Sequence, residues 1–103
     1  MSEPMTQEYE MGYTAREFEQ VLHGQFITTD SSYHCRDRSA SEWEIDYANG
    51  GAVTITIEPQ PPRELGVFSL PVLRVLFHFT DTDETAQKSF MARFFKYFHK
   101  GGG

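Results

Sequence analysis

Apolar and polar residues alternate most regularly between residues 43 and 57. Two runs with a period of two flank the sequence Asn49-Gly50-Gly51, and acidic residues and threonines fill the positions between their apolar members. The apolar positions are Trp43, Ile45, Tyr47, Val53, Ile55 and Ile57. Alternation of this kind predicts two strands, each with an apolar and a polar face, that are joined as a hairpin.

The register of this hairpin can be inferred from the apolar positions. A two-residue turn at Asn49-Gly50 would place Ile45 opposite Thr54, so apolar and polar side chains would share a face. A three-residue loop of residues 49–51 matches apolar with apolar positions and needs a left-handed residue, which Gly51 can supply. We therefore predict the pairs Tyr47–Val53, Ile45–Ile55 and Trp43–Ile57.

The strongest strand signal lies at Val72–Phe79, where Leu73, Val75, Phe77 and Phe79 alternate with other residues. Residues 80–84 are rich in N-capping side chains and acidic charge, which predicts the start of a helix. From there to His99, the large apolar side chains fall on one half of a helical wheel. They are Ala86, Phe90, Met91, Phe94, Phe95, Tyr97 and Phe98.

A shorter helix is predicted over residues 14–23. Thr14 and Glu17 have the spacing of a capping box, and Gly24 follows the apolar stripe as a C-terminal stop. The pairing of residues 25–38 stays open. Within them, residues 26–29 have strand character, residues 30–32 have turn residues, and residues 33–36 have the pattern of a return strand.

These elements predict an α+β fold, in which an antiparallel sheet of three to five strands carries an N-terminal and a longer C-terminal helix on one face. Residues 1–12 are polar and lack periodicity, so we expect a disordered N-terminal tail. Residues 13–100 are expected to form a single α+β domain. Residues 101–103 are expected to be flexible C-terminal glycines.

Residues 58–71 contain four of the five prolines and predict a long loop, because proline cannot donate a ladder hydrogen bond. The candidate interaction residues of this segment are Leu65, Val67, Phe68 and Leu70. Either these side chains fold back as a lid on the core, or they face water and form a partner site. We favour the lid, since a small domain has little apolar surface to spare.

The polar face of the predicted sheet is a second candidate surface. If the strand at residues 72–79 lies beside the hairpin, six polar side chains share that face, namely Glu44, Asp46, Thr54, Thr56, Arg74 and His78. Opposite charges on neighbouring strands would stabilise such a face modestly. It is either an ordinary solvated face or a polar platform for a ligand or partner.

Composition narrows the function only slightly. The 103 residues carry a net charge of −6, which argues against general binding of nucleic acid or anionic membranes. No apolar run is long enough to span a membrane, and the single Cys35 cannot form an internal disulfide, so we expect a cytoplasmic protein. Cationic neighbours could activate this thiol, but a plain, partly buried thiol is the preferred interpretation. The four histidines lack the spacings of a metal site, and we expect no cofactor.

The C-terminal Gly101-Gly102-Gly103 resembles the diglycine end of the ubiquitin-like carrier proteins. This resemblance implies that Gly102 and Gly103 form a carrier terminus whose carboxylate is activated as an acyl adenylate. Our leading hypothesis is nevertheless a non-enzymatic protein-interaction or regulatory module, which binds an unidentified protein partner or forms a homodimer. A third hypothesis is a small-molecule binder with a pocket between the sheet and the C-terminal helix, lined by several Phe and by the Tyr47 and Tyr97 hydroxyls.

Overall fold

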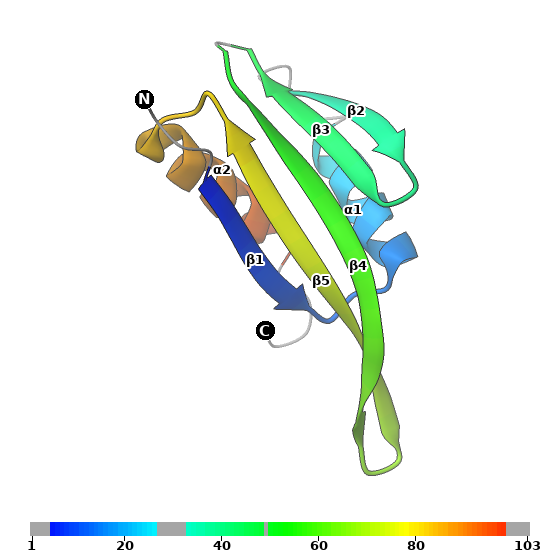
Figure 1. The fold of residues 1–103 in the computed structure, drawn as a ribbon. Coiled ribbons are helices and arrows are strands. Elements are labelled where there is room, and N and C mark those ends of the chain that lie inside the picture. The colour runs from blue at the N-terminus through cyan, green and yellow to red at the C-terminus, as the bar shows by residue number, and fades with distance from the viewer. Residues whose placement is uncertain (1–4, 27–32, 49, 99–103) are drawn as a thin grey trace.

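The computed structural model describes residues 5–26, 33–48 and 50–98. Their elements are β1 (Met5–Met11), α1 (Ala15–Phe26), β2 (Tyr33–Ser39), β3 (Glu42–Tyr47), β4 (Ala52–Leu65), β5 (Phe68–Thr80) and α2 (Glu84–Tyr97). The strands form one antiparallel sheet in the order β1-β5-β4-β3-β2 (Figure 1). This arrangement confirms the predicted α+β class and the antiparallel sheet, with five strands among the described residues.

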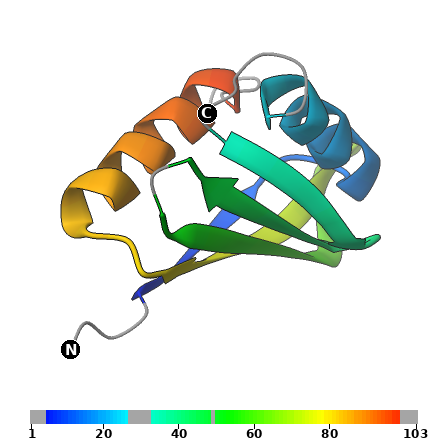
Figure 2. The same ribbon diagram turned by 90° about the horizontal axis from the view of Figure 1, so that it is seen from above.

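Two helices lie above one face of the sheet, which we call the inner face (Figure 2). The opposite face is the outer face. Phe18 of α1 contacts Trp43 of β3 and Phe94 of α2, with ring centroids 5.6 and 6.1 Å apart. Phe94 in turn meets Phe77 of β5 edge to face at 4.8 Å. A continuous aromatic layer therefore joins both helices to the sheet.

The inner face of the three central strands consists of the alternating apolar residues that the sequence predicts. All are at most 3% exposed, and they are Trp43, Ile45, Val53, Ile55, Ile57, Leu73, Val75, Phe77 and Phe79. Removing these side chains from water is the main favourable contribution to such a fold. The period of two therefore identified the buried face correctly.

The predicted pairing of Ile45 with Ile55 is wrong by two residues. Ile45 faces Val53, and Ile55 faces Trp43. The loop has three residues as predicted, but they are residues 48–50, because the Tyr47 amide donates to the Gly51 carbonyl at 3.0 Å. A shift of two leaves every side chain on its predicted face, so the apolar pattern alone could not detect it.

The pairing of β4 with β5, in which Ala52 faces Thr80, places Gly51 against the connection between β5 and α2. A Cβ atom on Gly51 would lie 2.7 Å from the Asp81 carbonyl oxygen and 2.7 Å from Thr82 Cγ2. Only glycine allows this approach, and the positive φ of 89° at Gly51 also favours glycine. This close contact explains why position 51 is glycine, which the strand pattern alone does not show.

The capping box at the start of α1 is confirmed. The Thr14 amide donates to Glu17 Oε1 at 3.0 Å, and the Glu17 amide donates to Thr14 Oγ1 at 3.1 Å. The helix continues through Gly24 to Phe26, however, so the predicted stop is wrong. Glycine inside a helix costs only about 1 kcal/mol, which the burial of the Phe18 side of α1 can offset.

Residues 25–38 follow the prediction only in part. Phe26, to which strand character was assigned, ends α1, and residues 27–32 lie outside the described residues. β2 contains the expected return strand at residues 33–36 and continues to Ser39. It pairs with β3 and is the edge strand on that side of the sheet.

Residues 5–11, expected to belong to a disordered tail, form β1 instead. This strand pairs with β5 from Met5↔Phe79 to Met11↔Leu73. Tyr9 points to the inner face, where its ring contacts Phe77 at 5.8 Å and Phe95 at 5.1 Å. The strand is recognisable only with β5 beside it, because a few partly buried side chains on a polar segment give too weak a local pattern.

α2 starts and ends near its predicted bounds. The Asp83 side chain caps it by accepting from the Ala86 amide at 2.7 Å. Two positions differ from the helical-wheel prediction. Tyr97 is 44% exposed, whereas Gln87 is buried and donates through Nε2 to the Thr82 carbonyl at 3.1 Å. That bond to the turn before the helix allows this polar side chain of α2 to be buried.

We predict that Gly51→Ala destabilises the protein far more than Gly50→Ala. Both residues have a positive φ, 89° at Gly51 and 103° at Gly50, which costs a non-glycine residue about 1–2 kcal/mol. Only Gly51 also meets backbone atoms, so its substitution should cost a further ~1–3 kcal/mol. Urea unfolding, followed by the fluorescence of the single Trp43, measures both variants. Equal losses would contradict the close contact with Asp81.

Candidate functional site

The segment predicted as a proline-rich loop is a two-stranded arm. β4 and β5 remain paired out to Leu65↔Phe68, whereas β3 reaches only Thr56 and β1 only Leu73 in the ladder. We call residues 59–71, beyond these ends, the arm. It projects from one end of the sheet (Figure 1), and the longest dimension of the molecule is 48 Å.

The four candidate interaction residues lie on this arm and face water. The exposed fractions of Leu65, Val67, Phe68 and Leu70 are 54%, 94%, 69% and 46%. The preferred interpretation of this segment as a lid is therefore wrong. A lid would have to fold back over the core, and ladder pairing holds both strands extended and away from it.

Three of these side chains share one face of the arm. Leu65 and Phe68 are direct partners, and Leu70 lies two residues from Phe68, so all three point the same way. Leu70 and Arg74 are four residues apart on β5 and therefore point to the same side. This face of the arm thus continues the outer face of the sheet, to which Arg74 belongs. Val67 lies in the turn, where only its neighbour Gly66 has a positive φ, 63°, as in a type II′ hairpin.

The prolines of the arm lie where the missing N–H groups remove no ladder bond. On β4, the Ile57 amide donates toward the β3 side, to the Ser41 carbonyl at 2.9 Å. Backbone groups alternate along a strand, so Pro59 faces the same side, beyond the end of β3. Pro71 on β5 faces the β1 side in the same way, beyond Met11.

A bulge completes this arrangement. The register shifts between Gln60 and Arg63, so Pro61 and Pro62 together oppose the single Pro71. Proline on an edge prevents the addition of a further strand because it offers no donor. The arm therefore presents its side chains to a partner and offers few free backbone donors.

Two hollows lie at the base of the arm. The first has a volume of about 190 Å³ and lies next to the end of β1; its lining residues are Glu10, Met11, Gly12, Arg63, Leu70, Pro71 and Val72. Arg63 Nη2 lies 3.6 Å from Glu10 Oε1 at its rim. The second has a volume of about 390 Å³ and lies toward α1, with Tyr13, Pro59, Pro62 and Pro71 among its lining residues.

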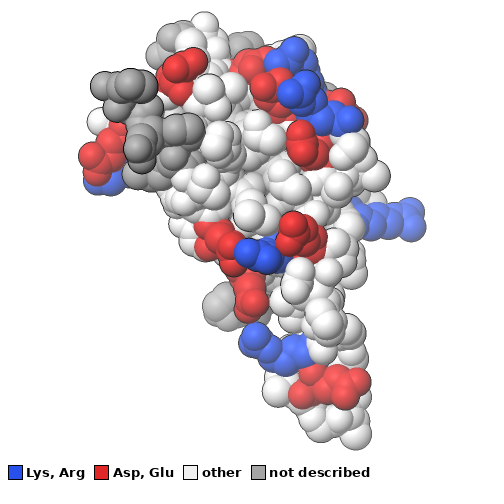
Figure 3. Space-filling model, viewed as in Figure 1, with Lys and Arg blue, Asp and Glu red and all other residues white. Residues whose placement is uncertain are grey.

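The six residues of the predicted polar face are brought together on the outer face. They alternate with the buried residues of β3, β4 and β5, and Glu44, Thr54 and His78 lie side by side across the three strands. Figure 3 looks onto this face and shows separate clusters of charge with uncharged surface between them.

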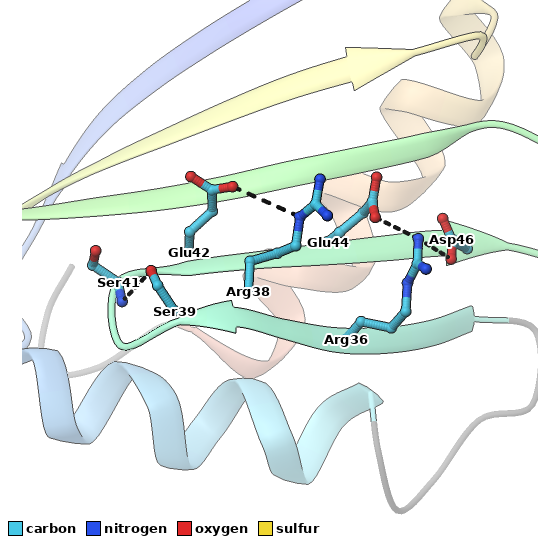
Figure 4. Close-up of polar contacts among 7 residues, drawn as sticks. All are labelled: Arg36, Arg38, Ser39, Ser41, Glu42, Glu44 and Asp46. Atoms are coloured by element: carbon cyan, nitrogen blue, oxygen red, sulfur yellow. Dashed lines mark hydrogen bonds and ion pairs between the residues drawn. The ribbon is translucent and has the colours of Figure 1, made fainter.

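Most charges on this face are paired with each other. Arg36 of β2 binds Glu44 and also lies 3.0 Å from Asp46 Oδ2 (Figure 4). Arg74 Nη2 lies 2.7 Å from Glu8 Oε1, and this hydrogen bond raises the pKa of the Arg74 guanidinium. Sequence reasoning missed Arg36 and Glu8 as members of this face, because both lie on strands whose pairing it had not established.

A groove of about 530 Å³ lies between the sheet and the N-terminus of α2. Its lining residues are Tyr33, Tyr47, Ala48, Asp83, Thr85, Ala86 and Ser89. The Tyr47 hydroxyl is buried and has no hydrogen-bond partner among the described residues. Burial, with Tyr33 as the second cause, raises the pKa of this phenol far above its usual value. This groove differs from the predicted pocket, because neither a phenylalanine nor Tyr97 lines it.

The remaining sequence candidates are not brought together. Burial raises the pKa of the Cys35 thiol to about 11, with the charge of Asp37 as the second cause. His23 Nε2 lies 3.1 Å from Asp37 Oδ1 and ties α1 to β2, while His78 Nδ1 lies 3.1 Å from Thr6 Oγ1. In the described part of the chain, no group of three or more His, Cys, Asp or Glu could hold a metal ion. Gly102 and Gly103 lie outside it.

No family model matches the chain, and comparisons with curated proteins and with solved structures also give no match. Within the described residues, no helix is long and apolar enough to cross a membrane.

We predict that Cys35 reacts slowly with iodoacetamide in the folded protein. With a pKa of about 11, only about 0.1% of the thiol is ionised at pH 8, compared with roughly a quarter at the ordinary cysteine pKa of ~8.5. Alkylation at pH 8 should therefore be on the order of 100-fold slower in the folded chain than in denaturant, and faster as the pH rises toward 11. Mass spectrometry gives both rates. Equal rates at pH 8 would show that the thiol is not shielded.

Proposed function

We propose that the protein is a non-enzymatic protein-interaction module that contacts its partner through the arm. One observation carries this proposal: Leu65, Val67, Phe68 and Leu70 face water together on a projecting hairpin. Contiguous apolar surface of this kind marks interaction sites in soluble domains. The cytoplasmic location inferred from the single cysteine remains part of the proposal.

The geometry of the arm supports binding by side chains. Ladder pairing already holds the arm extended before binding, so less conformational entropy is lost when a partner covers it than for an unpaired loop. Burying one such side chain contributes about 1.5–3 kcal/mol. Phe68 is the expected anchor, because it is the largest of the four exposed side chains and aromatic residues dominate interface energetics.

We predict that Phe68→Ala leaves stability unchanged and abolishes partner binding. A side chain that is 69% exposed contributes little to the fold, so the free energy of unfolding should change by no more than about 0.5 kcal/mol. A photo-crosslinking amino acid at position 68 should trap the partner in cells, whereas the same group at Lys88 on exposed α2 should not. Ser69→Ala, on the other face of the arm, is the matched control.

A large loss of stability in Phe68→Ala would assign this residue to the fold. Equal crosslinking from positions 68 and 88 would remove the arm as the contact surface.

Small-molecule binding is a second candidate function, which the Tyr47 hydroxyl favours. A buried hydroxyl without a partner destabilises a protein by about 1–3 kcal/mol, and a ligand in the adjoining groove could accept its hydrogen bond. We predict that Tyr47→Phe raises the free energy of unfolding by up to that amount. In a thermal-shift screen of metabolites, compounds that stabilise the wild type should fail to stabilise Tyr47→Phe. Destabilisation by Tyr47→Phe would show that the hydroxyl already has a partner.

A further inference from the structure

We infer that the arm binds the arm of a second copy of this chain, with the tip of each arm seated in the hollow at the base of the other. This inference rests on the proposed function, since it names the partner of the same surface. The same arm has a projecting apolar tip and, at its base, a hollow that includes apolar side chains.

The projecting part is the tip. Val67 and Phe68 are 94% and 69% exposed, and no other large hydrophobic side chain of the described residues is more exposed. Phe68 points to the same side of the arm as Leu65 and Leu70. An aromatic ring on a rigid hairpin loses few rotamers when it inserts into a pocket.

The receiving part is the hollow next to the end of β1. Leu70 and Val72 are its apolar lining residues on the side of the outer face, and the Arg63–Glu10 ion pair lies at its rim. Its volume of about 190 Å³ exceeds the ~150 Å³ of an apolar protein cavity that binds benzene, so a phenyl ring can enter it. Leu70 and Val72 occupy alternate positions that continue the face of Phe68, so the part of the hollow that they line lies on the same side of the arm as the tip.

A single two-fold axis can bring the tip of each arm to the hollow of the other arm. If two arms lie face to face and antiparallel, the axis passes between tip and base, and the tip of each copy meets the base of the other. Such an interface is the same on both copies and closes with two chains. The prolines at the arm edges favour this contact over joining two sheets edge to edge, because Pro59 and Pro71 offer no donor to an added strand.

Charge is compatible with this contact. The charged residues that line the hollow are Arg63 and Glu10, which pair with each other, so the surfaces that meet carry no net charge, while the chain as a whole carries −6. Taking ~150–200 Å² for each full side chain, at the lower end of the aromatic range, and the exposed fractions of 54%, 94%, 69% and 46%, the four side chains provide roughly 450 Å² per copy. Two copies then bury about 900 Å², below the ~1,200 Å² of a stable specific interface and in the range of weak, transient contacts. We therefore expect a weak dimer that dissociates at micromolar concentration.

Two variants test the two halves of the contact separately. Phe68→Ser removes the tip. Gly12→Leu fills the hollow, and the backbone tolerates it because a Cβ at Gly12 meets only the Pro71 carbonyl oxygen at 4.0 Å. In sedimentation equilibrium over a micromolar concentration range, the wild-type chain should show a monomer–dimer equilibrium. Each variant should weaken it at least tenfold with unchanged melting, and Ser69→Ala should not.

Mixing the two variants gives the decisive result. In a mixed dimer, the intact Phe68 of the Gly12→Leu chain meets the intact hollow of the Phe68→Ser chain, so one of the two contacts is restored. The mixture should therefore associate more strongly than either variant alone. Three outcomes would overturn the inference. The wild-type chain could stay monomeric throughout, both variants could dimerise as strongly as the wild type, or the mixture could associate no more strongly than each variant alone. A monomeric chain whose position 68 still crosslinks another protein would overturn the inference while leaving the proposed function intact.

Discussion

The pairing of β4 with β5 is the interaction on which the rest of this structure depends. The two strands are paired from Ala52↔Thr80 to Leu65↔Phe68, with one bulge. Along the first half, β3 and β1 add to their free sides and two helices cover the inner face (Figures 1 and 2). Along the second half, neither neighbour is present. One continuous ribbon thus forms the centre of the core and also the exposed arm.

An exposed ribbon of this length would ordinarily be prone to pair with further strands, because its edges carry unpaired backbone groups. Proline solves this problem without breaking the ribbon. Pro59 and Pro71 occupy positions whose backbone faces outward, and Pro61-Pro62 forms the bulge. The arm can therefore display apolar side chains while its edges stay closed. Because the proline positions lack backbone N–H donors, the arm favours contact through its side chains over the addition of another strand.

Features that depend on residues close together in the sequence were predicted well. Features that depend on contacts between distant residues were not. The capping box at Thr14 and the alternation through Ile55 are complete within a few residues, so they could be recognised directly. The hairpin register could not, because a shift of two residues leaves every side chain on its face. The contact of Gly51 with Asp81, thirty positions along the chain, was equally hidden from local patterns. The arm was mistaken for a loop because the side to which a proline nitrogen points is defined only once the neighbouring strands are known. The candidate residues Leu65 and Phe68 were identified, but their exposure follows from the ladder rather than from their own hydrophobicity.

The outer face and the arm differ in what a partner would have to displace. On the outer face, Arg36 and Arg74 already bind carboxylates of neighbouring strands. Covering these pairs would remove charges from water, and the desolvation penalty can exceed the attraction regained in the complex. The tip of the arm carries Val67 and Phe68, whose burial has no such penalty and removes apolar surface from water. A partner that touches both surfaces should therefore gain its affinity from the arm, while the ion pairs of the outer face contribute orientation.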